Sequence, residues 1–400
     1  MVHKQMSPVP DTERIQALDV LRGFSLLGIL LVNMIGFHSP YGYYNPYEYW
    51  EYGDVTAYTW LDIFVQGSFY PIFAMMFGYG LVIMQRRSAT RGNSFWTISI
   101  RRLSVLLVFG IIHAFLIWYG DILITYAVVG MILLLFLRLS GPWLMGLGWI
   151  LYLLPQLFLS GLLVLAAMMD TASLSDYIDI MGLKQAEVVY SSGSYWEITA
   201  QRIADWKVGN GSGGLIIYLF LILPMMMIGA GAAKMLWLEK AAVQRKKWLI
   251  ILLISLPVGL AFKMLPFMAG LSMSYQYIQD ALGGPILGMA YIAFLVLVMS
   301  HSKAANLLNP IGAAGRMSLT IYITQSVIGT LVFYPYGLGL YGKISIVSGN
   351  WLAVAIYVIQ VILAVLWLSK FEQGPIEKFW RFLTYGKNKR RGAQHENHEL

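Results

Sequence analysis

The sequence contains no cysteine, and only 12% of its 400 residues are charged. The absence of cysteine excludes disulfide bonds, thiolate metal sites, iron–sulfur clusters and cysteine nucleophiles. The scarcity of charge excludes an ordinary water-soluble chain, in which about 25% of the residues are charged. Because 58% of the residues are hydrophobic, the composition indicates an integral membrane protein.

Motifs of several function classes are missing as well. The sequence has no Walker motif, no zinc-ligand spacing, no glycine fingerprint of a dinucleotide site and no Ser-His-Asp order. ATP-driven transport and metallohydrolysis are therefore poorly supported, and we expect neither a metal ion nor a permanently bound cofactor. Residues 1–17 lack the short apolar core and cleavage site of a signal peptide, so the first hydrophobic run is expected to stay as a membrane helix.

Long apolar runs dominate the rest of the chain. Each has about the length that crosses a ~30 Å hydrocarbon layer. They predict an all-α fold, a polytopic bundle of about ten transmembrane helices in one domain, 1–370, followed by a surface helix within 371–386 and a tail, 387–400. The ten runs are 19–37, 64–84, 103–119, 121–138, 143–168, 214–237, 247–267, 283–300, 310–334 and 350–369.

The formal net charge of +8 could indicate a nucleic-acid binder in a soluble protein. With a cytoplasmic N-terminus, however, 23 of the 28 Lys and Arg residues fall on the cytoplasmic side of the predicted helices and five fall outside. This asymmetry is the positive-inside rule. The charge excess is then a topology signal, we expect no nucleic-acid partner, and both termini are predicted to be cytoplasmic in a multi-pass protein of the cell membrane.

Two predicted outer segments are long, 38–60 and 169–213. The first carries seven Tyr and two Trp, which favours an interfacial aromatic belt or, alternatively, a platform for a sugar or amphipathic acceptor. The second is acidic and is interpreted as a partly helical cap over the outer face or as a solvated loop.

A short helix is predicted at the cytoplasmic surface after the last membrane run. Gly374 and Pro375 break the chain and begin a new helix. An apolar stripe beside basic residues then indicates a helix lying on the membrane. The basic cluster 387–391 is expected to contact anionic lipid headgroups, and the last residues are expected to be disordered. The stripe consists of Ile376, Phe379, Trp380 and Leu383, next to Lys378 and Arg381.

Polar residues lie on one face of the first predicted helix. Asn33 follows Arg22 by eleven residues, which is about three turns of an α-helix. Asp19 precedes Arg22 by three residues, a spacing that allows an ion pair. Ionisable groups inside membrane helices are costly and mark functional sites, although Arg22 could also extend to cytoplasmic lipid phosphates. His38, at the outer end, is a candidate general base.

Two other predicted helices carry polar groups. His113 and Asp121 lie at one end of a predicted helical hairpin and could be a base and its orienting carboxylate, or a buried structural pair. In the ninth run, Ser318, Tyr322 and Gln325 are spaced to share a face. Together with Asp19 they are expected to line a substrate path inside the bundle.

Several segments resemble one known family in the right order along the chain. They include RIQALDVLRGFSLLGILLVN at 14–33, FYPIFAMMFGYG at 69–80, GDILITYAVVG at 120–130, GRMSLTIYITQS at 315–326 and GPIEKFWRFLTYG at 374–386. They are similar to the YeiB family of bacterial inner-membrane proteins. That family looks like a branch of a broader transmembrane acyltransferase group, which includes heparan-glucosaminide acetyltransferase and bacterial membrane O-acyltransferases.

The resemblance implies a function for the first helix. The shared pattern is LDxLRG with a polar residue eleven positions after the Arg, and here that residue is Asn33, with His38 a little further out. By this resemblance the chain is expected to move an acyl group from cytoplasmic acyl-CoA, as co-substrate, to an outer sugar, lipid or small molecule. Asn33 would stabilise the oxyanion, and His38 or His113 would act as base. The phosphates of acyl-CoA would be bound by Arg22, Arg101, Arg102 and Arg316.

The alternative interpretation is a transporter or flippase of a small molecule or lipid-linked substrate. A ten-helix bundle with polar helices would serve as a substrate path equally well. Secondary transporters commonly contain inverted repeats, and no repeat is evident here. The acyltransferase interpretation is therefore favoured.

Overall fold

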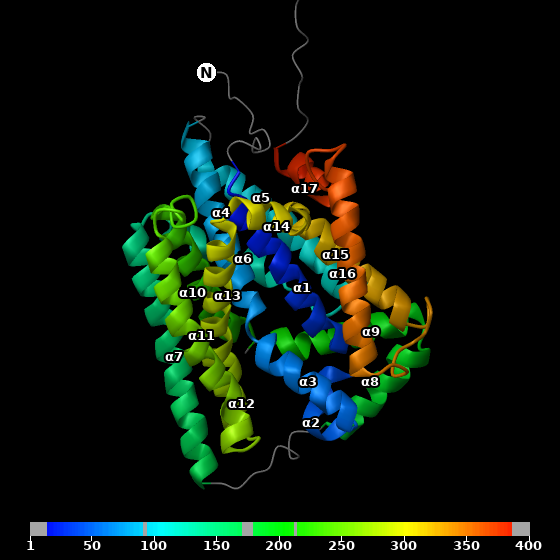
Figure 1. The fold of residues 1–400 in the computed structure, drawn as a ribbon. Coiled ribbons are helices and arrows are strands. Elements are labelled where there is room, and N and C mark those ends of the chain that lie inside the picture. The colour runs from blue at the N-terminus through cyan, green and yellow to red at the C-terminus, as the bar shows by residue number, and fades with distance from the viewer. Residues whose placement is uncertain (1–13, 91–93, 170–178, 212–213, 386–400) are drawn as a thin grey trace, which may run out of the picture.

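The computed structural model describes residues 14–90, 94–169, 179–211 and 214–385. These residues form a bundle of helices without any β-strand (Figure 1), which confirms the predicted all-α class. The predicted disordered tail, 387–400, lies outside the described residues. The helices are α1 (Gln16–His38), η2 (Tyr41–Tyr43), α2 (Pro46–Tyr49), α3 (Tyr52–Phe64), α4 (Phe69–Thr90), α5 (Phe95–Ile112), η3 (His113–Ile117), α6 (Leu123–Phe136), α7 (Gly141–Met169), α8 (Ile180–Ser192), α9 (Tyr195–Asn210), α10 (Gly214–Lys234), α11 (Arg245–Ala269), α12 (Met273–Ile278), η5 (Gln279–Gly283), α13 (Gly284–Met299), α14 (Ser302–Arg316), α15 (Ser318–Phe333), α16 (Ile346–Leu368) and α17 (Pro375–Tyr385).

Membrane-spanning character is widespread among these helices. Within the described residues, eight helical segments are long and apolar enough to cross a membrane. Two shorter apolar helices, α6 and α15, complete the set. The chain is therefore a multi-pass membrane protein, with elements close to the ten predicted runs.

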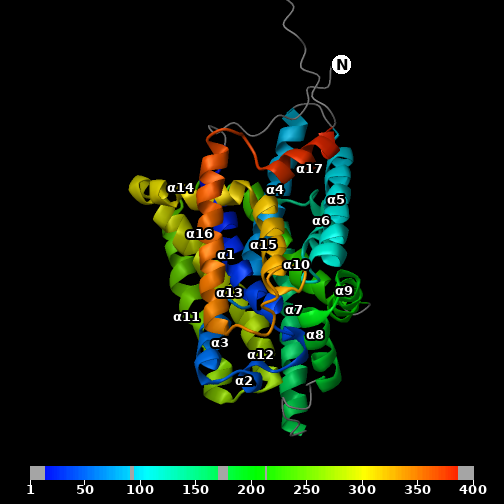
Figure 2. The same cartoon turned by 90° about the vertical axis from the view of Figure 1, so that its right-hand side faces the viewer.

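The structure corrects the prediction of one continuous helix over 310–334. The chain bends at Met317, where α14 ends and α15 begins. The bend allows α14 to pack closely on α1, because a Cβ atom on Gly315 would lie 1.8 Å from the carbonyl oxygen of Asp19. Figure 2 shows α14 extending sideways from the bundle. A separate helix, α3, also precedes the second run.

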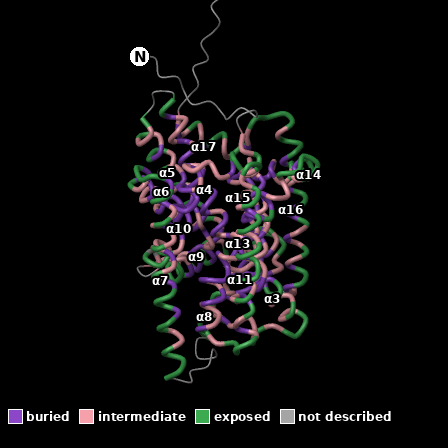
Figure 3. The backbone as a smooth tube through the Cα atoms, turned by 60° about the vertical axis from the view of Figure 1, so that its left-hand side comes forward, coloured by how far each residue is buried: buried purple, intermediate pink, exposed green. Residues whose placement is uncertain are grey.

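Glycines allow the closest contacts between helices. A Cβ atom on Gly78 of α4 would lie 2.0 Å from the carbonyl oxygen of Met226 in α10, and one on Gly229 would lie 1.9 Å from that of Met75. The two backbones therefore touch at both positions, as small residues permit in membrane bundles. Figure 3 shows buried residues concentrated in the interior of this bundle and exposed residues on its outer helices.

The bundle has two chemically different ends. Helix α1 begins, α4 ends and α17 lies at one end, which we call the basic end; α2, α3 and α8 lie toward the other, the aromatic end (Figure 1). At the aromatic end the two segments that were predicted to be outer pack together, because Tyr43 of the first donates a hydrogen bond to Asp205 of the second. Asp205, in α9, also accepts from Tyr190. Burial raises the pKa of Asp205 above its ordinary value.

Candidate functional site

A cavity of about 320 Å³ lies beneath α17 at the basic end, within the size range of small-molecule sites. Its walls come from α1, α4, α5, α6, α15 and α17, together with Gly315 and Arg316 at the end of α14. The polar part of the wall contains six arginines and two carboxylates. These side chains are Arg14, Arg22, Arg87, Arg102, Arg316 and Arg381, with Asp19 and Glu377.

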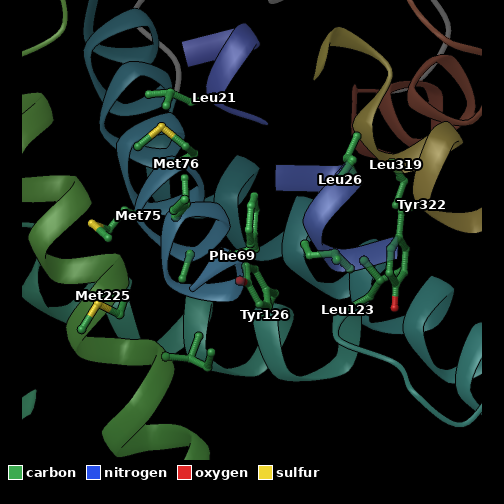
Figure 4. Packing of buried hydrophobic residues seen from close by; sticks show 14 of the residues in the cluster. Leu21, Leu26, Phe69, Met75, Met76, Leu123, Tyr126, Met225, Leu319 and Tyr322 are labelled. Atoms are coloured by element: carbon green, nitrogen blue, oxygen red, sulfur yellow. The ribbon is translucent and has the colours of Figure 1, made fainter. Parts of the chain in front are cut away.

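The other part of the cavity is apolar and extends into the bundle. Leu26 and Ile29 line it from α1, while Leu123 and Tyr322 line it from α6 and α15. Figure 4 shows Leu26, Leu123 and Tyr322 close to one another. Elsewhere in the same view, Met75 and Met225 pack between α4 and α10. The cavity is thus amphipathic, with cations at one end and hydrocarbon at the other.

The predicted pair on α1 lies in this wall. Arg22 and Asp19 are 3.7 Å apart between guanidinium and carboxylate, and Arg14 reaches the same carboxylate at 3.8 Å. Arg22 also donates to the backbone carbonyl of Met76 at 3.3 Å. The two predicted residues therefore lie together at the cavity, and the short i,i+3 spacing made that predictable.

Helix α17 covers the arginine-rich part. The carboxylate of Glu377 accepts hydrogen bonds from the backbone N–H groups of Leu319 and Thr320 at 2.8 and 2.9 Å. Trp380 donates from Nε1 to the carbonyl of Arg102 at 2.9 Å, and the Arg102 guanidinium lies 3.9 Å from the Trp380 ring centre. Burial raises the pKa of Glu377 above its ordinary value. The predicted surface helix is thus docked on the bundle.

Behind the apolar wall lies a fully buried His–Asp pair. His113 Nδ1 is 2.7 Å from the carboxylate of Asp121, and His113 Nε2 has no hydrogen-bond partner among the described residues. His113 begins the π-helical turn η3, a distortion often found at functional sites. Asp121 also accepts from the backbone N–H of Ile124 at 2.7 Å. The carboxylate is therefore fixed, and it orients the imidazole.

Tyr322 separates this pair from the cavity. Its ring centre is 5.0 Å from that of His113. Its hydroxyl donates to the carbonyl of Gly120 and accepts from the N–H of Ile122, each at 3.2 Å. Ile122 and Tyr322 line the cavity, so the imidazole lies just behind the wall.

Of the other predicted site residues, some line the cavity and others lie apart from it. Arg101 is exposed and does not line the cavity, whereas Ser318 does. Gln325 is buried and donates to Gln360 at 3.0 Å. Asn33 is half-buried one helical turn beyond Ile29, outside the cavity lining.

His38 lies apart from the cavity at the aromatic end. It is fully buried, with its ring centre 5.8 Å from Trp50 and 5.6 Å from Phe333. Neither ring nitrogen has a hydrogen-bond partner among the described residues. Of the two predicted histidines, only His113 has an orienting carboxylate and contacts a cavity-lining residue.

A second polar cluster has no sequence signal. Lys263 of α11 is fully buried and donates to Asp280 at 2.9 Å and to the carbonyl of Gln66 at 3.0 Å. Next to it, Asp62 accepts from Gln279 at 3.0 Å. Asp62 and Asp280 lie between the predicted runs and Lys263 lies near the end of one, so no helical spacing connects them. Among the described residues, no group of three or more His, Asp or Glu side chains could hold a metal ion.

The amino-acid sequence is similar to one family model and to several known proteins. A family model described as "Protein of unknown function (DUF418)" matches residues 232–387. The chain is 34% identical over 402 residues to "Uncharacterized protein YxaH" of Bacillus subtilis (strain 168), covering 95% of this chain and 96% of that protein. It is 28% identical over 390 residues to "Uncharacterized protein YeiB" of Escherichia coli (strain K12), covering 93% and 96%.

Proposed function

The chain belongs to the YeiB family of membrane proteins, and from this premise we propose that it is an acyltransferase that uses acyl-CoA as donor. One observation carries the proposal. The cavity joins a group of six arginines to an apolar end, and the buried His113–Asp121 pair lies behind that end. A donor with a phosphorylated head and an acyl thioester has the matching polarity.

The arginines suit the head of such a donor. Guanidinium groups bind phosphate through paired, charge-assisted hydrogen bonds. Arg22, Arg102 and Arg316 lie on three different helices around the cavity, so they can contact phosphates that are separated along one molecule. The acyl thioester would extend toward Leu26 and Tyr322.

The His–Asp pair supplies the base. Asp121 bonds Nδ1, which leaves Nε2 as the atom that accepts a proton. An acceptor hydroxyl of a sugar, lipid or small molecule attacks the thioester carbonyl while Nε2 takes its proton. The C–S bond then breaks, the thiolate of coenzyme A leaves, and the imidazolium returns the proton to it. The side chain of Tyr322 must move aside before His113 Nε2 can reach the acceptor hydroxyl.

The role of Asn33 is part of the same proposal. An amide side chain that donates to the developing oxyanion contributes typically 10²–10³-fold in rate. Asn33 follows Ile29 by one turn on α1, so a small extension of the cavity along α1 would reach it. His38, by contrast, would need a rearrangement of Trp50 and Phe333.

Binding of acetyl-CoA tests the proposal with a matched pair of variants. Arg102→Gln should weaken binding about 10–100-fold, because a charge-assisted contact is lost. Arg101→Gln changes the adjacent residue, which is exposed and outside the cavity, and should leave the affinity unchanged. Mass spectrometry of gently purified protein should also detect a co-purifying acyl-CoA. Absence of binding, or equal loss in both variants, would contradict the proposal.

The second candidate function is a transporter or flippase. The buried Lys263 and Asp62, with the partly exposed Asp280 paired to Lys263, favour it. Ionisable groups inside membrane helices commonly serve coupling or substrate paths. In that case protein in lipid vesicles would move substrate without acyl transfer. Asp62→Asn would then abolish transport and leave acetyl-CoA binding unaffected.

A further inference from the structure

Helix α17 is tied to the rest of the chain by the short connection 369–374, and it lies over the arginine-rich part of the cavity. We infer that α17 is a lid that opens to admit the ligand, and that the side chain of Glu377 is the latch that holds it closed. The inference rests on the proposed function only for the identity of the ligand. The closing contacts stand by themselves.

The latch joins α17 to the beginning of α15. The first N–H groups of a helix have no partner within it, and here Leu319 and Thr320 donate theirs to Glu377 Oε1 at 2.8 and 2.9 Å. The hydroxyl of Thr320 donates to Glu377 Oε2. One side chain on α17 thus satisfies three donors on another helix.

The connection is shaped to this contact. A Cβ atom on Gly374 would lie 2.1 Å from Glu377 Oε2 and 2.8 Å from Thr320 Oγ1. Any larger residue would displace the carboxylate. Gly374 is therefore needed for the latch to close, independently of the charge of Glu377.

Besides the Trp380–Arg102 contacts described above, α17 has a ring contact at its exposed edge. Phe379 stacks on Phe109 of α5 with ring centres 6.0 Å apart, and Phe379 and Phe382 are 53% and 46% exposed. Such an amphipathic helix can rest on a membrane surface when it leaves the cavity. Trp380, Arg381 and Tyr385 line the cavity from α17, so outward movement of α17 would open the arginine-rich part to a ligand.

Accessibility of the cavity measures the lid directly, since the chain has no cysteine of its own. Ser318 lines the cavity under α17, and Ser318→Cys gives a single thiol there. The probe is the anionic reagent 2-sulfonatoethyl methanethiosulfonate. We expect slow labelling in this background and labelling about tenfold faster or more with Glu377→Ala or Gly374→Ala, because charge-assisted bonds of the closed state are lost.

Two further variants distinguish a latch from general damage. Glu372→Ala removes an exposed carboxylate in the same connection and should not change the labelling rate. Glu377→Gln keeps an acceptor oxygen for the two N–H groups, so its labelling rate should stay close to that of Ser318→Cys alone. If Glu377→Ala and Gly374→Ala both label at the parent rate, the lid proposal is wrong.

Hydrogen exchange of the unaltered chain gives a test that needs no variant. The N–H groups of Leu319 and Thr320 should exchange faster than those in the middle of α15, because lid opening exposes them. Equal protection would overturn the proposal even if every variant failed to fold. Acetyl-CoA should slow labelling of Ser318→Cys; failure of that effect alone counts against the proposed ligand and leaves the latch result intact.

Discussion

The position of single ionisable side chains distinguishes the two predicted histidines. His113 has a carboxylate at 2.7 Å and a tyrosine ring from the cavity wall beside it. His38 has neither and is enclosed by Trp50 and Phe333. Both are fully buried, so burial alone does not identify a base. The orienting partner does.

Asp121→Asn is the sharpest test at this scale. Asparagine can still accept from Ile124 and fill the same space, but it no longer stabilises a charged imidazole. We expect the rate of acyl transfer to fall roughly 10²–10⁴-fold, with the affinity for acetyl-CoA unchanged. Asp179→Asn, at the exposed beginning of α8, is the matched control. Loss of affinity equal to the loss of rate would argue against an orienting role.

Sequence alone predicted part of this residue-level arrangement. The pairs Asp19–Arg22 and His113–Asp121 were predictable because each lies within one or two helical turns or one hairpin. Glu377 and Thr320 are 57 residues apart, and no local pattern connects them. Long-range contacts of this kind depend on the packing of α17, which spacing rules do not describe.

Among the elements, α4 and α10 have the closest backbone contact through Gly78 and Gly229. Gly78→Ala should force the helices apart and destabilise the protein by about 1–3 kcal/mol, the usual effect of overpacking. Gly146→Ala, where a Cβ atom meets nothing within 4 Å, is the control and should be neutral or slightly stabilising. Thermal unfolding in detergent measures both.

Helix α9 should respond to acid at its beginning. Ser194 and Glu197 form a capping box, and the backbone hydrogen bond from Ser194 lowers the pKa of Glu197. A lowered pKa means that the ionised form favours the helix, so this contribution is present above the ordinary pKa and is lost as pH falls through the lowered one. As pH falls through the lowered pKa of Glu197, the hydrogen-exchange protection of the first turn of α9, corrected for intrinsic exchange rates, should decrease. Glu197→Gln should remove most of the pH dependence, and an unchanged dependence would contradict this assignment.

The bend between α14 and α15 marks the limit of prediction for elements. Residues 310–334 form one apolar run, and neither Met317 nor its neighbours are helix breakers. The bend arises because Gly315 meets α1 and Glu377 binds the first N–H groups of α15. The partners in both contacts, α1 and Glu377, lie far from the bend in sequence. Apolar length predicts that a helix exists, whereas tertiary contacts decide where it bends.

For the whole molecule, the charge asymmetry predicts that the basic end faces the cytoplasm. Cysteines introduced by Ser94→Cys at the basic end and Gly53→Cys at the aromatic end test this, because both positions are exposed. A membrane-impermeant maleimide should label only Gly53→Cys in cells whose membrane surface is accessible. Both should react after the membrane is permeabilised. Labelling of Ser94→Cys alone in intact cells would show that the basic end faces outward, opposite to the prediction.

The global fold was predictable to a greater extent than the cavity. Runs of apolar residues predicted the helices because lipid requires each span to satisfy its own backbone hydrogen bonds. The cavity combines side chains from Arg14 to Tyr385, which are the first and the last of the described residues. Arg14, Arg87 and Arg381 belong to it only because their helices meet there.

The docking of α17 on α15 also has a consequence for biosynthesis. The ribosome makes α1 well before α17, so the pocket remains without its cover while the helices between them are inserted. A nascent or prematurely ended chain would insert its spans yet leave Arg22, Arg102 and Arg316 exposed at the bilayer surface. A bulky fusion placed directly after Tyr385 should likewise hinder the docking of α17 and leave these arginines uncovered.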